Sequence, residues 1–147
     1  MLGWLFPSCK RDFKARRYLN IVLRTVHLFG IAGFAGLFMF DLEEALWRPY
    51  AMIALFSGLL MVVLELYVDA IWILQMRGIA VIVKLMILCL AAIEPQYLLL
   101  MFTLMIALSG YFSHAPGRVR YYVPLFKRVI PSSHELRVVL ANRNRNA

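Results

Sequence analysis

Six ionisable side chains stand within or at the ends of long apolar stretches of this sequence: Arg24, His27, Glu65, Asp69, Lys84 and His114. A charged group in the hydrocarbon of a bilayer costs about 2.5–3.5 kcal/mol, even on the most lenient insertion scale. Such groups are therefore expected to face the interior of a protein and to pair. They also mark candidate proton paths, transport sites and cofactor sites.

The spacing of these residues allows pairing. Arg24 and His27 are three residues apart, and Glu65 and Asp69 are four apart, so each pair shares one helix face. With neutral histidines, the two cations Arg24 and Lys84 balance the two carboxylates, as a low-dielectric interior requires. The sequence therefore predicts an intramembrane ion cluster of Arg24, Glu65, Asp69 and Lys84 in the cytoplasmic half of the protein.

Several of these residues also have a plainer interpretation. His114 precedes Ala-Pro-Gly-Arg, where a histidine can end a helix and meet water. Asp69 can lie at a solvated helix end and pair with Arg77. For Lys84 an internal salt bridge is favoured over snorkelling, because the residue is far from either surface. For His27, a structural hydrogen bond and a cofactor or proton role both stay open.

The elements that must position these groups are four apolar segments in a chain that is 63% hydrophobic. A membrane-spanning helix needs about 20 residues. We therefore predict an all-α integral membrane protein, with four transmembrane helices in an up-down bundle and the fourth helix beside the first. The segments run over about residues 18–40, 50–76, 79–93 and 97–114.

The net charge of +8 comes mainly from the two ends of the chain. Basic flanks remain in the cytoplasm and meet anionic lipid headgroups, so both termini are predicted to be cytoplasmic and no nucleic-acid partner is expected. The chain divides into a basic interfacial leader (1–17), with Trp4, Leu5 and Phe6 in the headgroup layer, a four-helix transmembrane bundle (18–117) and a basic cytoplasmic tail (118–147).

The tail is not expected to span the membrane, since Pro124 and Pro131 interrupt it. Ser132 and Glu135 form a capping-box pattern ahead of a short amphipathic helix that ends near Ala141, before disordered Asn-Arg repeats. A solvated tail and a partner-docking tail both stay open. Five apolar residues are candidates for the membrane surface: Val119, Tyr122, Phe126, Val129 and Ile130.

The first apolar segment carries Gly30, Gly33 and Gly36 on the turns that follow His27. Small residues at this spacing are typical of close helix packing in membranes. A second interpretation is that they leave room for a flat ligand such as a porphyrin beside His27.

Other metal chemistry has weaker support. Met101 and Met105 are four residues apart, a spacing that suits Cu(I), but methionine is also ordinary apolar filler. Cys9 and Cys89 have no metal-ligand spacing and are expected to be free thiols. The chain has no nucleotide-binding loop, no nucleophile constellation and no H-E-x-x-H pattern.

Three segments, "RTVHLFGIAGFAGLF", "RPYAMIALFSGLLM" and "RGIAVIVKLMIL", give the chain a family resemblance. The chain resembles the small four-helix bacterial membrane proteins that include the oxygen-independent protoporphyrinogen oxidases, and the copper-resistance D membrane domains. The resemblance covers the first three helices and implies a bacterial cytoplasmic (inner) membrane location. It implies that His27 is a haem or porphyrin ligand and that Lys84 is functional. The fourth segment, "SGYFSHAPGRVRYY", departs from the family pattern.

Three hypotheses follow. The first is a protein that binds haem b or a porphyrin, with His27 and His114 as iron ligands and with Arg24 and Lys84 paired to the propionates. The second is a non-catalytic accessory subunit of a larger membrane complex or a homo-oligomer. The third is transport of protons or a metal through His27 and the carboxylates of the ion cluster. The residues do not decide whether the protein is an enzyme.

Overall fold

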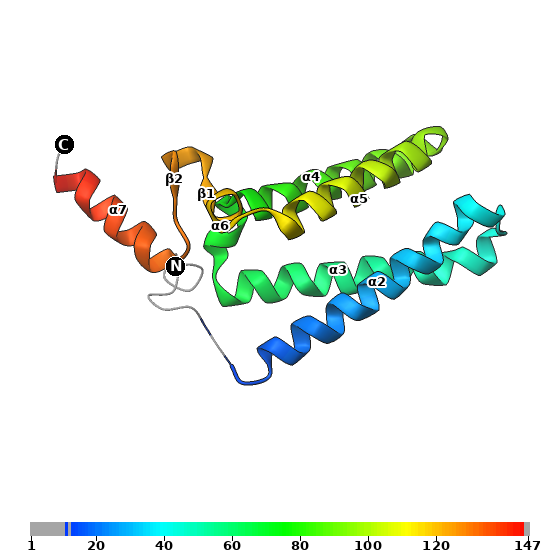
Figure 1. Ribbon diagram of the computed structural model, residues 1–147, viewed down its shortest axis with the longest axis horizontal. Helices are drawn as coiled ribbons and strands as arrows, with labels where there is room; N and C mark the ends of the chain where they lie inside the picture. The colour runs from blue at the N-terminus through cyan, green and yellow to red at the C-terminus, as the bar shows by residue number, and fades with distance from the viewer. Residues whose placement is uncertain (1–10, 12, 146–147) are drawn as a thin grey trace. The chain divides into compact units, whose positions relative to one another are not determined.

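A computed structural model describes Arg11 and residues 13–145, and it consists mainly of helices (Figure 1). Four of the described helices are long and apolar enough to cross a membrane, with spans Arg16–Phe40, Glu44–Val68, Met76–Ile93 and Pro95–His114. The prediction of four long apolar helices is therefore confirmed, and their insertion into a membrane stays a prediction. The predicted interfacial residues Trp4, Leu5 and Phe6, and Cys9, lie outside the described residues.

The chain forms two compact units, which we describe separately: an N-terminal hairpin, Arg11–Val68, and a C-terminal unit that contains everything from Asp69 onward. The predicted closure of all four helices into one bundle stays a prediction.

The N-terminal hairpin consists of α2 (Arg16–Phe40) and α3 (Glu44–Val68), which lie side by side in Figure 1. Helix α2 ends because Asp41 adopts a left-handed backbone conformation with φ of 49°, which a short polar residue tolerates best among non-glycine residues. At the other end of the hairpin, the backbone N–H of Arg11 donates to the Val68 carbonyl (3.1 Å). The Arg11 side chain donates to the Tyr67 carbonyl (3.1 Å), so two of the open carbonyls at the end of α3 have a partner.

Glycines bring the two helices of the hairpin into close contact. A Cβ atom at Gly30 would lie 2.5 Å from the backbone nitrogen of Ala54 and 2.9 Å from the carbonyl oxygen of Tyr50. At Gly33, a Cβ atom would collide with the ring of Tyr50. The packing interpretation of the first two glycines is therefore confirmed, and the face proposed for a flat ligand is filled by α3.

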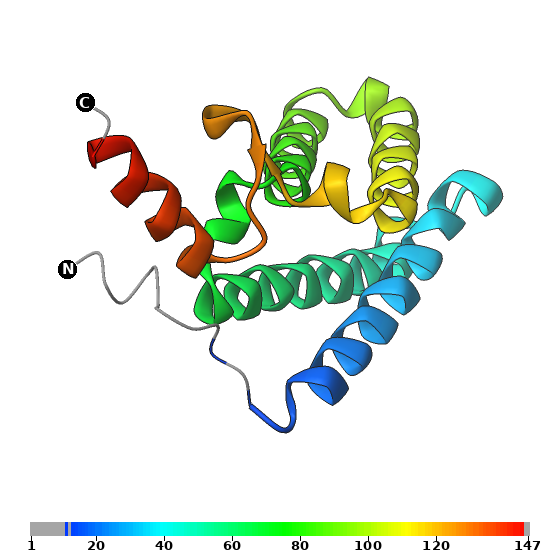
Figure 2. The same ribbon diagram turned by 60° about the vertical axis from the view of Figure 1, so that its left-hand side comes forward.

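In the C-terminal unit, α4 (Met76–Ile93) and α5 (Leu98–His114) form a second hairpin, joined by the 3₁₀ turn η2 (Pro95–Tyr97) (Figure 2). Proline stands at the first position of this turn, where its missing N–H group costs nothing.

The predicted second span, which reached Met76, was wrong at its C-terminal end. Helix α3 stops at Val68, and the residues after it form a separate 3₁₀ helix, η1 (Ala70–Leu74). The cause is local: Asp69 is extended, with φ of −166°, and its carboxylate accepts from the N–H of Ile71 (3.3 Å) as the N-cap of η1. Helix α3 also begins earlier than expected, at Glu44, and contains Pro49.

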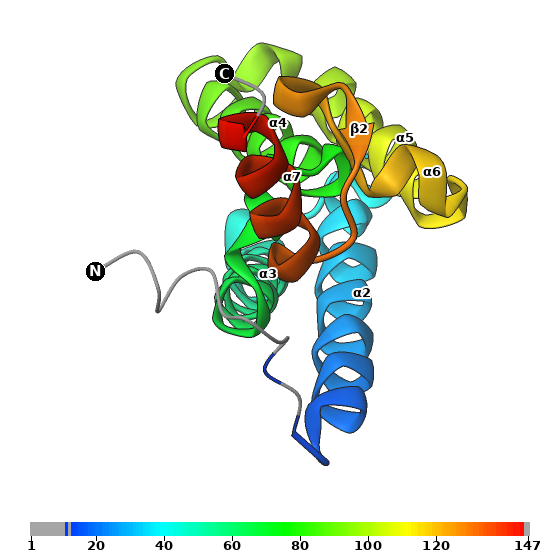
Figure 3. The same ribbon diagram turned by 90° about the vertical axis from the view of Figure 1, so that its left-hand side faces the viewer.

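The tail folds against η1. It contains α6 (Gly117–Arg120), the antiparallel pair β1 (Tyr122–Val123) and β2 (Arg128–Val129) joined by η3 (Pro124–Phe126), and α7 (Ser133–Arg145) (Figure 3). A small apolar core, with Leu74 and Phe126 packed against it, joins the tail to η1. Its buried members are Ile71, Val123, Ile130 and Leu136.

This core changes the interpretation of the tail. Ile130 is 1% exposed, so it does not lie on the outer surface that we expected for it. Phe126 is half-buried, with one side packed against the core. The predicted capping box is confirmed, since the N–H of Glu135 donates to the Ser132 hydroxyl (3.4 Å). Helix α7 continues to Arg145, so the expectation of disorder in the Asn-Arg repeats was wrong up to that residue.

Candidate functional site

His27 connects the two helices of the N-terminal hairpin. Its Nδ1 atom lies 2.8 Å from the carbonyl oxygen of Ala54 and 3.2 Å from the hydroxyl of Ser57, both on α3. A carbonyl oxygen only accepts, so Nδ1 must carry the proton. The Ser57 hydroxyl donates to the carbonyl of Ile53 (2.6 Å), so its oxygen can accept a hydrogen bond from Nδ1 of His27. The structural hydrogen bond considered for His27 is therefore present.

Gly58 makes room for the imidazole. A Cβ atom at position 58 would lie 3.1 Å from Cε1 of His27, tighter than an ordinary contact. The sequence did not identify Ser57 and Gly58 as partners of His27. The available sequence signal was Ser57 itself, because a serine in an apolar helix needs a hydrogen-bond partner.

The packing tests the fit of a porphyrin. A haem ligated by His27 along the glycine face would need the space that Ala54 and Tyr50 occupy. The residues present do not fit a haem on this face. Ligation of His27 in any other arrangement stays a prediction.

Lys84 lies in α4 and donates to the hydroxyl of Ser109 in α5 (3.1 Å). Ser109 in turn donates to the backbone carbonyl of Met105 (2.8 Å). Its hydroxyl therefore connects the lysine side chain to the backbone of α5 through two hydrogen bonds. Lys84 thus joins two neighbouring helices as His27 does. Its partner is a hydroxyl, whereas we expected a carboxylate.

Asp69 is 4% exposed and binds the first residue of α7. One carboxylate oxygen accepts from the backbone N–H of Ser133 (3.0 Å), and the other accepts from the Ser133 hydroxyl and the N–H of Ile71. An aspartate at a helix N-terminus stabilises that end through its open N–H groups and the helix dipole. Asp69 is thus a buried structural residue, whereas the sequence suggested a member of the ion cluster or a solvated helix end paired with Arg77.

Gln75 and Arg77 extend this contact. The Gln75 amide donates to the carbonyl of Ile130 (2.7 Å), and Arg77 donates to the Gln75 side-chain oxygen (2.7 Å). The Arg77 guanidinium also lies 5.0 Å from the centre of the Tyr121 ring. The segment between α3 and α4 is therefore the anchor of the tail.

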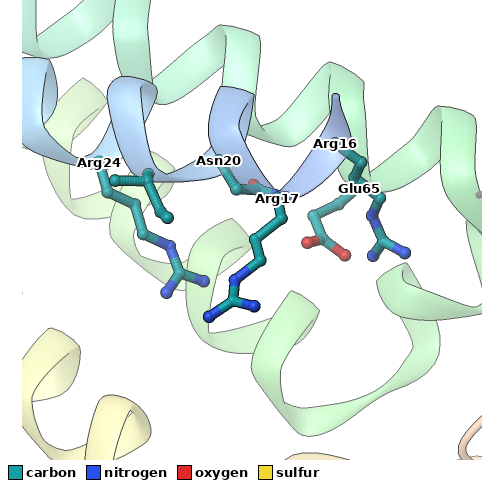
Figure 4. A pocket seen from close by; sticks show the side chains of 6 residues that line it. Arg16, Arg17, Asn20, Arg24 and Glu65 are labelled. Carbon is teal, nitrogen blue, oxygen red and sulfur yellow. The ribbon is translucent and has the colours of Figure 1, made fainter. Parts of the chain in front are cut away.

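Arg24 and Glu65, the other two members of the predicted ion cluster, line one pocket of the N-terminal hairpin, together with Arg16, Arg17, Asn20 and Ile21 (Figure 4). The four-residue cluster itself stays a prediction, since two of its members belong to each unit.

The remaining candidates have ordinary surroundings. His114 is exposed and ends α5, in agreement with its plainer interpretation, and its convergence with His27 stays a prediction. Cys89 is a free, exposed thiol on α4. Within residues 11 and 13–145, no group of three or more His, Cys, Asp or Glu side chains could hold a metal ion.

Comparisons with known proteins identify no relative: no family model, no curated protein and no solved structure matches this chain. The resemblance to the four-helix porphyrin and copper-resistance proteins stays a prediction.

Proposed function

We propose that this chain is a non-catalytic structural subunit of a membrane assembly. The observation that carries the proposal is the use of the intramembrane polar side chains: His27 holds α2 to α3, and Lys84 holds α4 to α5. In a membrane, interhelical hydrogen bonds and small-residue packing take over the role that the hydrophobic effect has in water. These side chains therefore have a structural use that requires no substrate or cofactor.

An outward-facing site on α5 supports association with another helix. Gly110 and Ala107 are exposed, and a Cβ atom at Gly110 would meet nothing within 4 Å. Small exposed residues on a spanning helix let a second helix approach closely. Gly30, by contrast, already has its partner helix within the chain.

The proposal also includes the kind of membrane and the orientation of the chain within it. The cations before α2 and after α5 favour a cytoplasmic location for both termini, with Asp41, Glu43 and Glu44 in an outer connection. The resemblance of the first three segments supports a bacterial cytoplasmic membrane. The basic ends then face anionic headgroups.

Measuring protein mass in native nanodiscs, in parallel with a visible absorption spectrum, tests the proposal. We expect a protein mass above that of one chain and no Soret band. Gly110→Leu should lower the mass without unfolding the chain, whereas Ala92→Leu, at an exposed alanine of α4, should leave it unchanged. A solitary chain with a Soret band that disappears in His27→Ala would refute the proposal and restore the haem hypothesis.

A further inference from the structure

A charged pocket of about 560 Å³ lies on the N-terminal hairpin, beside the first turns of α2. Five of its lining residues come from α2 (Arg16, Arg17, Asn20, Ile21 and Arg24), and Glu65 comes from α3. Figure 4 shows the labelled charged side chains pointing to the same side of α2.

Helix geometry explains why these side chains converge. Arg17, Asn20 and Arg24 follow a spacing of three and four residues, so they lie on one face. Side chains of an α-helix tilt toward its N-terminus, which directs Arg24 back toward Arg17. Glu65 lies three residues before the end of α3, at the end of the hairpin where α2 begins.

The pocket has an excess of positive charge. Three arginines face one glutamate, which leaves two uncompensated charges. Within the part of the chain that the structure describes, Arg17 and Arg24 have no hydrogen-bond or ion-pair partner, and both are exposed. A guanidinium so close to the hydrocarbon layer is costly unless an anion or water meets it.

We propose that this pocket binds the phosphate group of an anionic phospholipid. The planar fork of a guanidinium matches phosphate oxygens with two parallel hydrogen bonds, and two or more arginines can hold one phosphate. Asn20 adds an amide donor beside them. Ile21 supplies an apolar wall for the glycerol and upper acyl chain.

The depth of the pocket favours a lipid over a soluble phosphate. Helix α2 has 25 residues, so it is about 37 Å long, against about 30 Å of hydrocarbon. The surplus of about 7 Å carries the first turn into the headgroup layer. Arg24 lies about 12 Å along the axis from Arg16, and its long side chain reaches back to that layer.

Native mass spectrometry of the full chain, released from vesicles of phosphatidylcholine with or without phosphatidylglycerol, tests this site. We expect one phosphatidylglycerol to remain bound to the wild-type chain. The Arg17→Gln/Arg24→Gln variant should bind this lipid roughly 30-fold more weakly, because each cation near an anionic surface contributes about fivefold in affinity. The matched control, Lys127→Gln/Arg128→Gln, removes the same charge from exposed residues of the tail and should retain the lipid as the wild type does.

Three results would overturn the proposal. Equal retention by the Arg17→Gln/Arg24→Gln variant would show that the pocket is not the site. Equal retention of phosphatidylcholine would show that the anionic headgroup is not recognised. Displacement of the lipid by millimolar inorganic phosphate would identify a soluble phosphate as the ligand. These outcomes are independent of the oligomer mass that tests the structural role.

Discussion

The Nδ1 atom of His27 lies 2.8 Å from the backbone carbonyl oxygen of Ala54, on the neighbouring helix, and Gly58 leaves the space that the imidazole ring fills. The histidine that most suggested a cofactor is thus built into the contact between α2 and α3. A polar residue in a membrane helix can have a purely structural cause, and its partners must be known before a ligand is inferred.

The contact between His27 and Gly58 predicts a non-additive pair of substitutions. His27→Ala should destabilise the hairpin by about 1–2 kcal/mol, from a lost interhelical hydrogen bond and a cavity. Gly58→Ala should also destabilise it, because the added Cβ atom would lie 3.1 Å from the imidazole. In the His27→Ala background, the same glycine substitution should cost less. A double-mutant cycle of unfolding in detergent measures the coupling, and strictly additive losses would contradict the contact.

Gly30 is predicted to tolerate no side chain. The three atoms nearest to a Cβ atom there are backbone atoms of α3, at 2.5–2.9 Å, and backbone cannot rotate away. Gly30→Ala should therefore separate the helices and cost about 1–3 kcal/mol, the usual range for overpacking. Gly117→Ala is the matched control, since its Cβ atom would lie at an ordinary contact distance of 3.6 Å from the Tyr121 ring. Thermal unfolding of both variants in one detergent makes the comparison, and equal midpoints would contradict the packing.

The four long apolar helices and the glycine packing were predictable because both depend on local patterns. Long apolar runs predict spanning helices, and Asp41 follows the first run directly. Gly30 and Gly33 lie on the face that small residues use for helix packing. The partners of His27 were less accessible, since Ser57 is 30 residues away and the register of the hairpin decides which residue faces the imidazole.

The anchor of the tail could not be predicted in the same way. The stretch "VDAIWIL" is apolar enough to continue a long helix, and one aspartate within it does not by itself predict that the helix ends there. The partner of that carboxylate is Ser133, 64 residues later. Contacts of such separation depend on the tertiary fold, so the sequence indicated a solvated or docking tail where a packed one exists.

Asp69 is predicted to control the docking of α7. Asp69→Asn removes the charge from two acceptor oxygens and turns an amide N–H group toward the donors of Ser133. Hydrogen bonds to a charged group contribute about 1.5–3 kcal/mol, so the tail should open measurably. Faster backbone hydrogen exchange in α7, with exchange in α2 unchanged, is the expected result.

Glu94→Gln is the control for this substitution, because it neutralises a carboxylate at the end of α4 that caps no helix of the tail. Ser133→Ala should have a smaller effect than Asp69→Asn, because its backbone N–H remains bonded to the carboxylate. If α7 exchanges at the wild-type rate in Asp69→Asn, the proposed anchor is not what holds the tail.

The pair of Lys84 and Ser109 predicts an asymmetry between its two members. Ser109→Ala removes the hydroxyl that accepts from the ammonium group and leaves a half-buried charge between α4 and α5 without that partner. Lys84→Met removes the charge itself and fills similar volume with apolar atoms. Breaking a buried polar contact from one side costs more than replacing the charged member by an apolar one. Both substitutions lose the bond between α4 and α5, but Ser109→Ala should lower the stability of the helix pair more than Lys84→Met, which leaves no charge without its partner. Thermal unfolding in detergent distinguishes them, with Thr103→Ala as the control for losing a hydroxyl that bonds only within its own helix. The opposite order, with Lys84→Met the more damaging, would mean that the charge itself has a use that the hydrogen bond to Ser109 does not explain.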